Sequence, residues 1–260
     1  MEHVLLSATA READSEIIDR PDRKQVRTPS SLRPNHNKVI VARFDSEPGA
    51  NAGIAAIVAD HRERGARMNW FVGPSSSPAN LGQRLLAHGL QVIGPSMGMG
   101  RVIGNDDFPL DLPGLTVKPV ASEADLHEYA DVSVLAWERD QAFREAMVHI
   151  GRAALERNLP TRSWIASIDG EPVATSHLRL MDECGYLQGC AVIPSRRRQG
   201  LYRALVHHRL AYLREQGLDL AVIWAAAGTS GQGCLKLGFS AVCEGTFYEL
   251  PDAGPQRATT

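Results

Sequence analysis

The segment that most constrains the fold of this chain is residues 190–205, CAVIPSRRRQGLYRAL. An apolar run typical of a strand ends at Pro194, an arginine-rich loop follows, and a helical pattern begins at Gly200. A strand, a short loop and a helix in this order direct unpaired backbone N–H groups and the positive end of the helix dipole toward one place. We interpret this turn as a site for an anion, above all a phosphate, which Gly200 allows close to the backbone.

The arginines of this turn permit two interpretations. Arg197 and Arg198 can donate charge-assisted hydrogen bonds to a phosphate. The same residues are compatible with a solvated basic turn in front of an ordinary helix. Charge alone does not separate these alternatives, so the predicted strands and helices around the turn must be considered as well.

Residues 115–250 predict a mixed sheet flanked by helices. Asp169-Gly170 between two apolar runs is the pattern of a tight β-hairpin. Ser122, with Asp125 three residues later, predicts a capped helix start. The expected strands are 115–120, 164–168, 172–180, 186–193, 220–225 and 239–250, and the expected helices are 122–137, 141–156, 200–216 and 231–237.

The first half of the chain predicts a smaller α/β domain over residues 38–110. Polar composition with interspersed prolines predicts a disordered leader over residues 1–37, and residues 251–260 read as a polar tail. Residues 94–114, rich in Gly, Pro and Asp, are expected to link the two domains. The expected strands are 38–44, 68–73 and 91–93, and the expected helices are 51–64 and 80–88.

Composition places the chain among soluble globular proteins. It has 260 residues, of which 43% are hydrophobic, so a buried core needs neither disulfides nor a metal. A formal net charge of -2 argues against a nucleic-acid partner. The four cysteines form no Cys-x-x-Cys pair, so no metal is expected, and a reducing cytoplasm is the simplest location. No secretory signal or membrane span is visible in the sequence.

The phosphate turn resembles motif A of the GCN5-related N-acetyltransferase (GNAT) family. Arg197, Gly200 and Tyr202 occupy its three fixed places, with Tyr where the family has Gly or Ala. Residues 234–239, CLKLGF, resemble the family's Tyr-x-Lys-Leu-Gly-Phe with Cys at the Tyr place, and residues 169–174 match its hairpin turn. The resemblance covers about residues 115 to 250 and implies the GNAT fold, an α/β (α+β) fold with a mixed, mostly antiparallel sheet flanked by helices.

The resemblance further implies an acyltransferase that moves an acetyl group from acetyl-CoA to an amine of a small molecule. In this family the strand before the turn pairs with the pantetheine, and the turn holds the pyrophosphate. The Val192 backbone N–H is the implied donor to the oxyanion. The implied cofactor-binding residues are Cys190, Ala191, Val192, Arg197, Arg198, Gln199, Gly200, Leu201, Tyr202 and Arg203.

The general acid and base are open at this point. Cys234 stands where the family often has its acidic tyrosine, although a buried structural thiol is the alternative. Tyr202 and Tyr248 are substitutes that could equally be packing residues. For the base, Tyr186 lies near the place where the family often has a glutamate on a strand, and His177 lies on the preceding strand. The reaction could also proceed without a dedicated base.

The N-terminal half resembles the shortened GNAT-like half of two-part family members, because residues 72–82 echo a strand–loop–helix phosphate turn. A plain α/β support domain is the alternative. Asn69, Trp70 and Ser75 are candidates for one wall of an acceptor pocket.

Two other functions remain open: a non-catalytic acyl-CoA sensor or partner-binding module, and an enzyme that uses an acyl group on a carrier protein. The acceptor, the acyl chain length and the oligomeric state, a homodimer included, are not fixed by the sequence.

Overall fold

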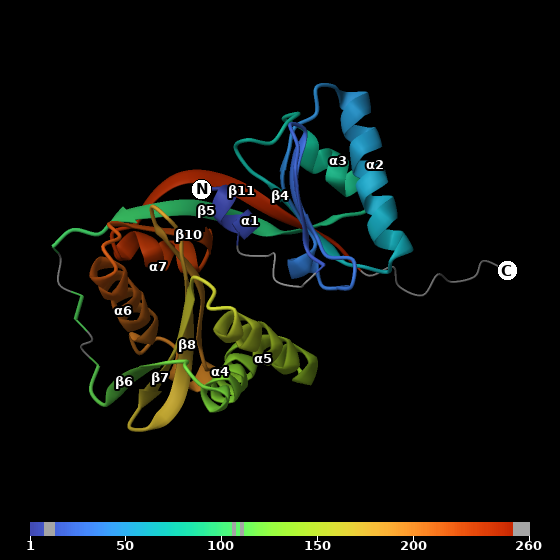
Figure 1. Ribbon diagram of the computed structural model, residues 1–260. Coiled ribbons are helices and arrows are strands. Elements are labelled where there is room, and N and C mark those ends of the chain that lie inside the picture. Colours follow the sequence, from blue (N-terminus) through green and yellow to red (C-terminus); the bar gives the residue numbers. More distant parts are fainter. Residues whose placement is uncertain (8–13, 106–107, 110–111, 252–260) are drawn as a thin grey trace. The chain divides into compact units, whose positions relative to one another are not determined.

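The computed structural model describes residues 1–7, 14–105, 108–109 and 112–251. Contacts divide the chain into two compact units (Figure 1). Unit 1 comprises Met1–Gly98, Ala225–Gln232 and Ala241–Thr260, and unit 2 comprises Met99–Trp224 and Gly233–Ser240.

Unit 1 is a sheet whose helices α2 and α3 share one core. Its strands follow the order β1-β2-β3-β4-β11, in which β3 and β4 are parallel and the other pairs antiparallel. Ile54 of α2 and Leu81 of α3 pack with Trp70 of β4, so both helices cover the same face (Figure 1). The elements are α1 His3–Ser7, β1 Glu16–Asp19, β2 Arg23–Arg27, a 3-10 turn Pro34–His36, β3 Lys38–Ala42, α2 Glu47–Glu63, β4 Met68–Val72, α3 Leu81–Ala87 and β11 Ser240–Leu250.

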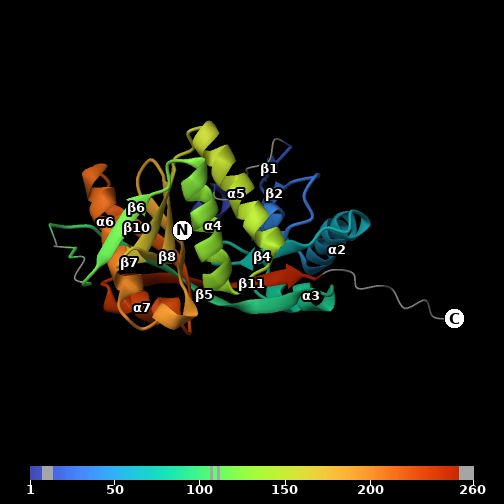
Figure 2. The same ribbon diagram turned by 90° about the horizontal axis from the view of Figure 1, so that it is seen from below.

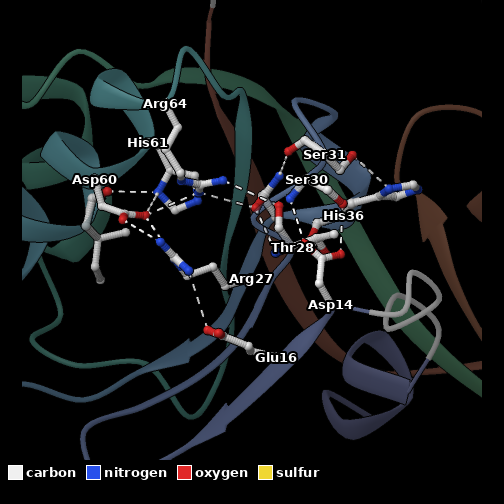
Figure 3. Close-up of polar contacts among 12 residues, drawn as sticks. Asp14, Glu16, Arg27, Thr28, Ser30, Ser31, His36, Asp60, His61 and Arg64 are labelled. Atoms are coloured by element: carbon white, nitrogen blue, oxygen red, sulfur yellow. Dashed lines mark hydrogen bonds and ion pairs between the residues drawn. The ribbon is translucent and has the colours of Figure 1, made fainter.

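The N-terminal segment differs from the disordered leader that we expected over residues 1–37. Strands β1 and β2 extend the sheet, and a polar cluster ties them to the rest of unit 1 (Figure 3). Arg27 donates two hydrogen bonds to the Asp60 carboxylate of α2, at 2.9 and 3.2 Å, and Asp14 accepts two from Ser30 at 2.8 Å. Arg27 is thus paired with a residue of α2, and Asp14 with a residue of the same N-terminal segment. Residues 8–13 of the predicted leader, and residues 252–260 of the predicted tail, lie outside the described residues.

The segment expected as a linker also differs. Strand β5 runs over Gln91–Val102, 12 residues, through Gly94, Pro95 and Gly98. Its hydrogen-bonded place beside β11 keeps it extended despite residues that usually break strands. Helix α2 likewise begins earlier than expected, because Ser46 caps it by accepting a hydrogen bond from the Gly49 N–H.

Unit 2 is a sheet with the strand order β10-β9-β8-β7-β6, in which only β9 and β10 are parallel among the pairs with a recorded register. Helix α4 covers one face and helix α6 the other (Figures 1 and 2). The elements are β6 Leu115–Pro119, α4 Glu123–Trp137, α5 Gln141–Glu156, β7 Thr161–Ile168, β8 Glu171–Leu180, β9 Gly185–Val192, a 3-10 turn Pro194–Arg196, α6 Leu201–Glu215, β10 Leu220–Ala226 and α7 Ser230–Lys236.

The local patterns of unit 2 fold as the sequence indicates. Asp169 and Gly170 both have positive φ, at 51° and 85°, as a two-residue hairpin turn requires. Ser122 and Asp125 form the capping box that starts α4. The mixed, mostly antiparallel sheet flanked by helices is confirmed.

Candidate active site

The central feature of unit 2 is a gap between its two parallel strands. Within the described residues, the ladder between β9 and β10 contains only the pairs Gly185–Ala221 and Tyr186–Val222. Strand β9 continues to Val192 and β10 to Ala226. The strands therefore separate after their first residues, and the far half of β9 has no neighbour in that direction.

A β-bulge accounts for this separation. His177 of β8 faces Gln188, but the preceding Ser176 faces Cys190, so Gly189 is an extra residue in β9. Gly189 has φ +42°, in the left-handed region that glycine tolerates. An extra residue bends a strand and increases its twist, which turns β9 away from its partner.

A buried arginine of α6 holds the bulge in place. Arg209 is 0% exposed, and its Nη1 donates to the carbonyl oxygens of His177 and Gln188, both at 3.1 Å. Its Nε donates to the Leu205 carbonyl at 3.0 Å. Sequence reasoning missed this residue, because nothing in the helical pattern distinguishes a buried arginine from a surface one.

The backbone direction of β9 decides which amides face the gap. The Ile193 N–H donates to the Val173 carbonyl of β8 at 3.0 Å. Backbone groups alternate along an antiparallel strand, so the Ala191 amide also faces β8, whereas those of Cys190 and Val192 face away from it. Of the three strand residues predicted to pair with a cofactor, two therefore direct backbone groups into the gap.

The turn after β9 has the expected uncapped helix start. Gly200 is the N-cap of α6 with φ +88°, and no side chain caps it. The first turn of α6 contains no acidic residue, and Arg198 before it also has positive φ, at 63°. The first-turn N–H groups, from Leu201 to Arg203, are thus available to an anion, as helix geometry predicts.

The arginines of the turn have different surroundings. The Arg197 guanidinium donates to the carbonyl oxygens of Ala136 at 2.8 Å and Val192 at 3.2 Å, so it ties the turn to α4 and β9. Arg198 and Arg203 are exposed and carry no ion pair among the described residues. The structure therefore leaves Arg198 and Arg203 for a ligand and gives Arg197 a bracing position.

The remaining predicted residues of the turn contribute mainly backbone. The Gln199 side chain reaches the Ser195 carbonyl at 3.4 Å. Leu201 is 2% exposed and packs into the core with Val132 and Ala136 of α4.

Tyr202 and Cys234, the two departures from the family pattern, meet one another. The Tyr202 hydroxyl lies 3.2 Å from the Cys234 Sγ. The Tyr202 ring lies over Gly233, where an added Cβ would come within 3.4 Å of it. Burial raises the pKa of both side chains. The Tyr202 side chain of α6 therefore occupies space that the small residues Gly233 and Cys234 of α7 leave free.

The two candidate bases lie on the opposite face of the sheet. The His177 Nδ1 is 2.8 Å from the Ser163 hydroxyl, and Thr175, on the same face of β8, contacts Ser133 of α4 at 3.2 Å. Tyr186 faces Arg179 in the ladder and so shares the face of His177. It is buried, and burial raises its pKa.

Two predicted site residues, Trp70 for the acceptor pocket and Tyr248 as a substitute acid, lie in the core of unit 1. Trp70 is 0% exposed within the unit 1 core, so it cannot line the wall of a pocket. Tyr248 belongs to the same core, and its hydroxyl lies against Gly82 of α3. Asn69 is 9% exposed and Ser75 lies in the loop after β4.

The described residues contain neither a cluster suited to a metal ion nor a helix suited to spanning a membrane. No three His, Cys, Asp or Glu side chains among them gather closely enough to hold a metal ion. Every helix in this part of the chain is too short or too polar to cross a membrane.

Comparison with known proteins agrees with this geometry. Residues 126–239 match the sequence profile of the acetyltransferase (GNAT) family. No protein with a curated description matches the chain. Unit 2 thus contains a GNAT domain, and the whole chain has the fold of a two-part GNAT protein.

Three solved structures show the extent of the fold similarity. A GCN5-related N-acetyltransferase from Kribbella flavida aligns with a TM-score of 0.70 at 18% identity, over 99% of this chain and 97% of that one. A functionally unknown conserved protein from Staphylococcus epidermidis aligns at 0.72 and 12% identity, over 92% and 94%. A tandem GNAT protein from the clavulanic acid biosynthesis pathway aligns at 0.62 and 15% identity, over 98% and 88%.

Proposed function

We propose that the protein transfers an acetyl group from acetyl-CoA to an amine of a small molecule. One observation carries this proposal: the half of β9 that is open on its β10 side leads, through the turn at residues 193–200, into the uncapped start of α6. A pantetheine arm needs exposed backbone amides, and a pyrophosphate needs clustered N–H donors. Unit 2 offers both in one continuous stretch of chain, and its family is one of acetyltransferases.

In this proposal each part of acetyl-CoA would be bound by a different element of unit 2. The pyrophosphate would lie at the N-terminus of α6, between Arg198 and Arg203. The pantetheine would follow β9 away from the turn, past Val192 first and Cys190 next. The thioester carbonyl then lies nearest the Cys190 N–H, so that amide is a better oxyanion donor than the Val192 N–H that the family resemblance implies.

The two faces of the sheet suggest separate roles on either side of the thioester. The amine would approach from the face that α4 covers, where His177 and Tyr186 lie. Its nitrogen attacks the thioester carbon, and the tetrahedral intermediate collapses with loss of the CoA thiolate. The proton released from the amine passes to a base on that face or to water.

Calorimetric titration of the full-length protein with CoA and acetyl-CoA tests the binding step. We expect Gly200→Glu to weaken binding about 100-fold or more, because a carboxylate facing the pyrophosphate costs several kcal/mol and distorts the turn. Gly217→Glu is the matched control at the other end of α6, since Gly217 also has positive φ, at 75°, and no heavy atom lies within 4 Å of an added Cβ. Equal affinity of the Gly200→Glu variant and the parent protein would contradict the proposed site.

Release of free thiol from acetyl-CoA tests the transfer step across amino acids, polyamines and aminoglycoside antibiotics. Turnover with one class identifies the acceptor. Tight binding without turnover on any amine would favour an acyl-CoA sensor instead. Preference for a pantetheinyl carrier protein over free CoA would favour the third candidate function, which has no need of Arg198 and Arg203.

A further inference from the structure

Two polar groups on the α6 face of unit 2, the half-buried Tyr202 hydroxyl and the fully buried Arg209 guanidinium, have incomplete hydrogen bonding. The hydrogen bond recorded for the Tyr202 hydroxyl is to a thiol, which is a weak partner. The Arg209 Nη2 is buried and has no hydrogen-bond partner among the described residues, and no carboxylate there forms an ion pair with this guanidinium. Buried donors are normally paired, so both groups call for an explanation.

These groups belong to one cluster beside the gap in the sheet. The Cys190 side chain faces α6, because it packs with Leu205 and Ala174. Burial raises the pKa of the Cys190 thiol, and the Arg209 charge acts in the opposite direction. Tyr202 and Cys234 also lie within electrostatic range of Arg209. The cluster therefore contains one phenol, two thiols and a single cation, drawn from β9, α6 and α7.

A buried cation without a counter-ion is expensive to maintain unless a negative charge reaches it. The proposed reaction, on which this inference rests, releases a second negative charge, after that of the oxyanion, beside Cys190, whose side chain belongs to this cluster. It is the sulfur of CoA, released when the carbon–sulfur bond of the tetrahedral intermediate breaks and its electron pair moves to sulfur.

We infer that Tyr202 and Arg209 together receive the departing thiolate of CoA. The Tyr202 hydroxyl turns from the Cys234 thiol to the CoA sulfur and donates a hydrogen bond to it. The buried Arg209 guanidinium supplies a fixed positive charge nearby. Because burial raises the pKa of Tyr202, the phenol keeps its proton near neutral pH and acts as a donor. The thiolate later takes a proton from water, so the phenol needs no reprotonation.

The acidity of the bound CoA thiol tests this inference without knowledge of the acceptor. Ultraviolet absorbance of the thiolate is followed against pH in the full-length protein saturated with CoA. Subtracting the complex with desulfo-CoA removes the protein's own cysteines and tyrosines. We expect the bound thiol to have a pKa below that of free CoA.

Tyr202→Phe keeps the ring and removes only the hydroxyl. It should raise the pKa of the bound thiol by about one unit, a tenfold change in the thiolate fraction. Tyr212→Phe is the matched control, because Tyr212 lies near the other end of α6 with its hydroxyl bonded to Arg162 at 3.1 Å. That control should leave the thiol pKa unchanged.

Cys234→Ala separates the phenol from its thiol partner. It should leave the pKa of the bound thiol the same or lower, because the Tyr202 hydroxyl becomes free to turn. A rise equal to that of Tyr202→Phe would assign the role to Cys234 and overturn the inference.

Failure of this inference is distinguishable from failure of the proposed function. Unchanged thiol acidity in Tyr202→Phe, with CoA still bound, overturns the thiolate site and leaves the transferase proposal intact. Absence of CoA binding in the parent protein removes both. Arg209 is less informative as a test residue because it also holds the bulge in β9.

Discussion

The two units contain the same strand–helix–strand motif, but only one offers an open gap. In unit 1, β3 and β4 are parallel and pair only at Lys38–Asn69 and Val39–Trp70. In unit 2, β9 and β10 pair over an equally short stretch. Both pairs of strands then separate. Each unit therefore contains two parallel strands that diverge after a short ladder.

The gap of unit 1 is closed by its own chain. After β4 the chain returns, so that the Ser77 N–H donates to the Ala42 carbonyl at 2.9 Å and the Phe44 N–H donates to the Ser77 carbonyl at 3.2 Å. These bonds satisfy the backbone groups that a pantetheine would use. The Phe44 ring also lies against Gly53 of α2, where an added Cβ would be only 2.4 Å from it.

The helix starts differ in charge as well. Ser46 caps α2, and Glu47 in its first turn forms an ion pair with Arg84 at 2.6 Å. Helix α6 instead begins at an uncapped glycine between two exposed arginines. A capped and acidic helix start repels a phosphate. A few loop residues, rather than the fold, therefore decide which helix start is suited to an anion.

The stoichiometry of CoA binding is the strongest way to break this comparison. We expect calorimetry to show one CoA per chain, because the start of α6 is uncapped beside Arg198 and Arg203, whereas the start of α2 is capped and acidic. A second equivalent of CoA that survives Gly200→Glu would show that unit 1 also binds, and would end the distinction.

Loss of the Arg27–Asp60 pair should affect unit 1 and spare the CoA site. We expect Asp60→Ala to lower the free energy of unfolding by about 1–2 kcal/mol, because charged hydrogen bonds of a partly exposed group are lost. Urea denaturation measures that change, and CoA titration of the same variant should give the parent affinity. A parallel loss of CoA affinity would show that the units are not independent in this respect.

The pH dependence of unit 1 stability tests the role of the fully buried His61. Burial lowers the pKa of His61 below its ordinary 6.5, so the folded state favours the neutral ring. This stability is fully present above pH 6.5 and is lost as the pH falls below that value toward the folded pKa, by at most about 1.4 kcal/mol per pH unit. His61→Gln should flatten this part of the stability profile measured by urea denaturation at each pH. A profile identical to that of the parent would assign the titration to another group.

The smallest expected effect concerns the exposed arginines. Arg203→Ala should weaken CoA binding about 3- to 10-fold at low salt, because an exposed charge contributes about 1 kcal/mol to a phosphate contact. Raising the ionic strength should reduce the difference. Arg84→Ala, which removes the α3 arginine that pairs with Glu47 at the start of α2, should change the affinity little. An equal loss of affinity there would contradict the distinction between the two units.

The sequence reveals those parts of the fold that depend on neighbouring residues. The hairpin turn at Asp169-Gly170, the capping box at Ser122 and the uncapped helix start at Gly200 each need only local chemistry, and each is present. The order of strands and helices in unit 2 follows from the same local patterns.

Other parts depend on contacts between distant residues, which local patterns do not encode. Arg27 orders the N-terminal strands through Asp60, 33 residues away. The gap in unit 2 depends on Arg209 and Gly189, and the site on a contact between Tyr202 and Cys234, 32 residues apart. Tyr202 and Cys234 each depart from the family motif in which they stand. Only the structure shows that the larger residue on α6 fills the space beside the smaller residue on α7.

The place of β11 has a consequence for how the protein is made. This strand, from the end of the chain, pairs with β4 from Thr246–Val72 to Leu250–Met68, and Tyr248 and Leu250 complete the core around Trp70. On the ribosome, the first hundred residues therefore emerge without the last strand of their own sheet. They remain incompletely packed while the GNAT domain is synthesised. Expression of residues 1–98 alone would leave their sheet without β11.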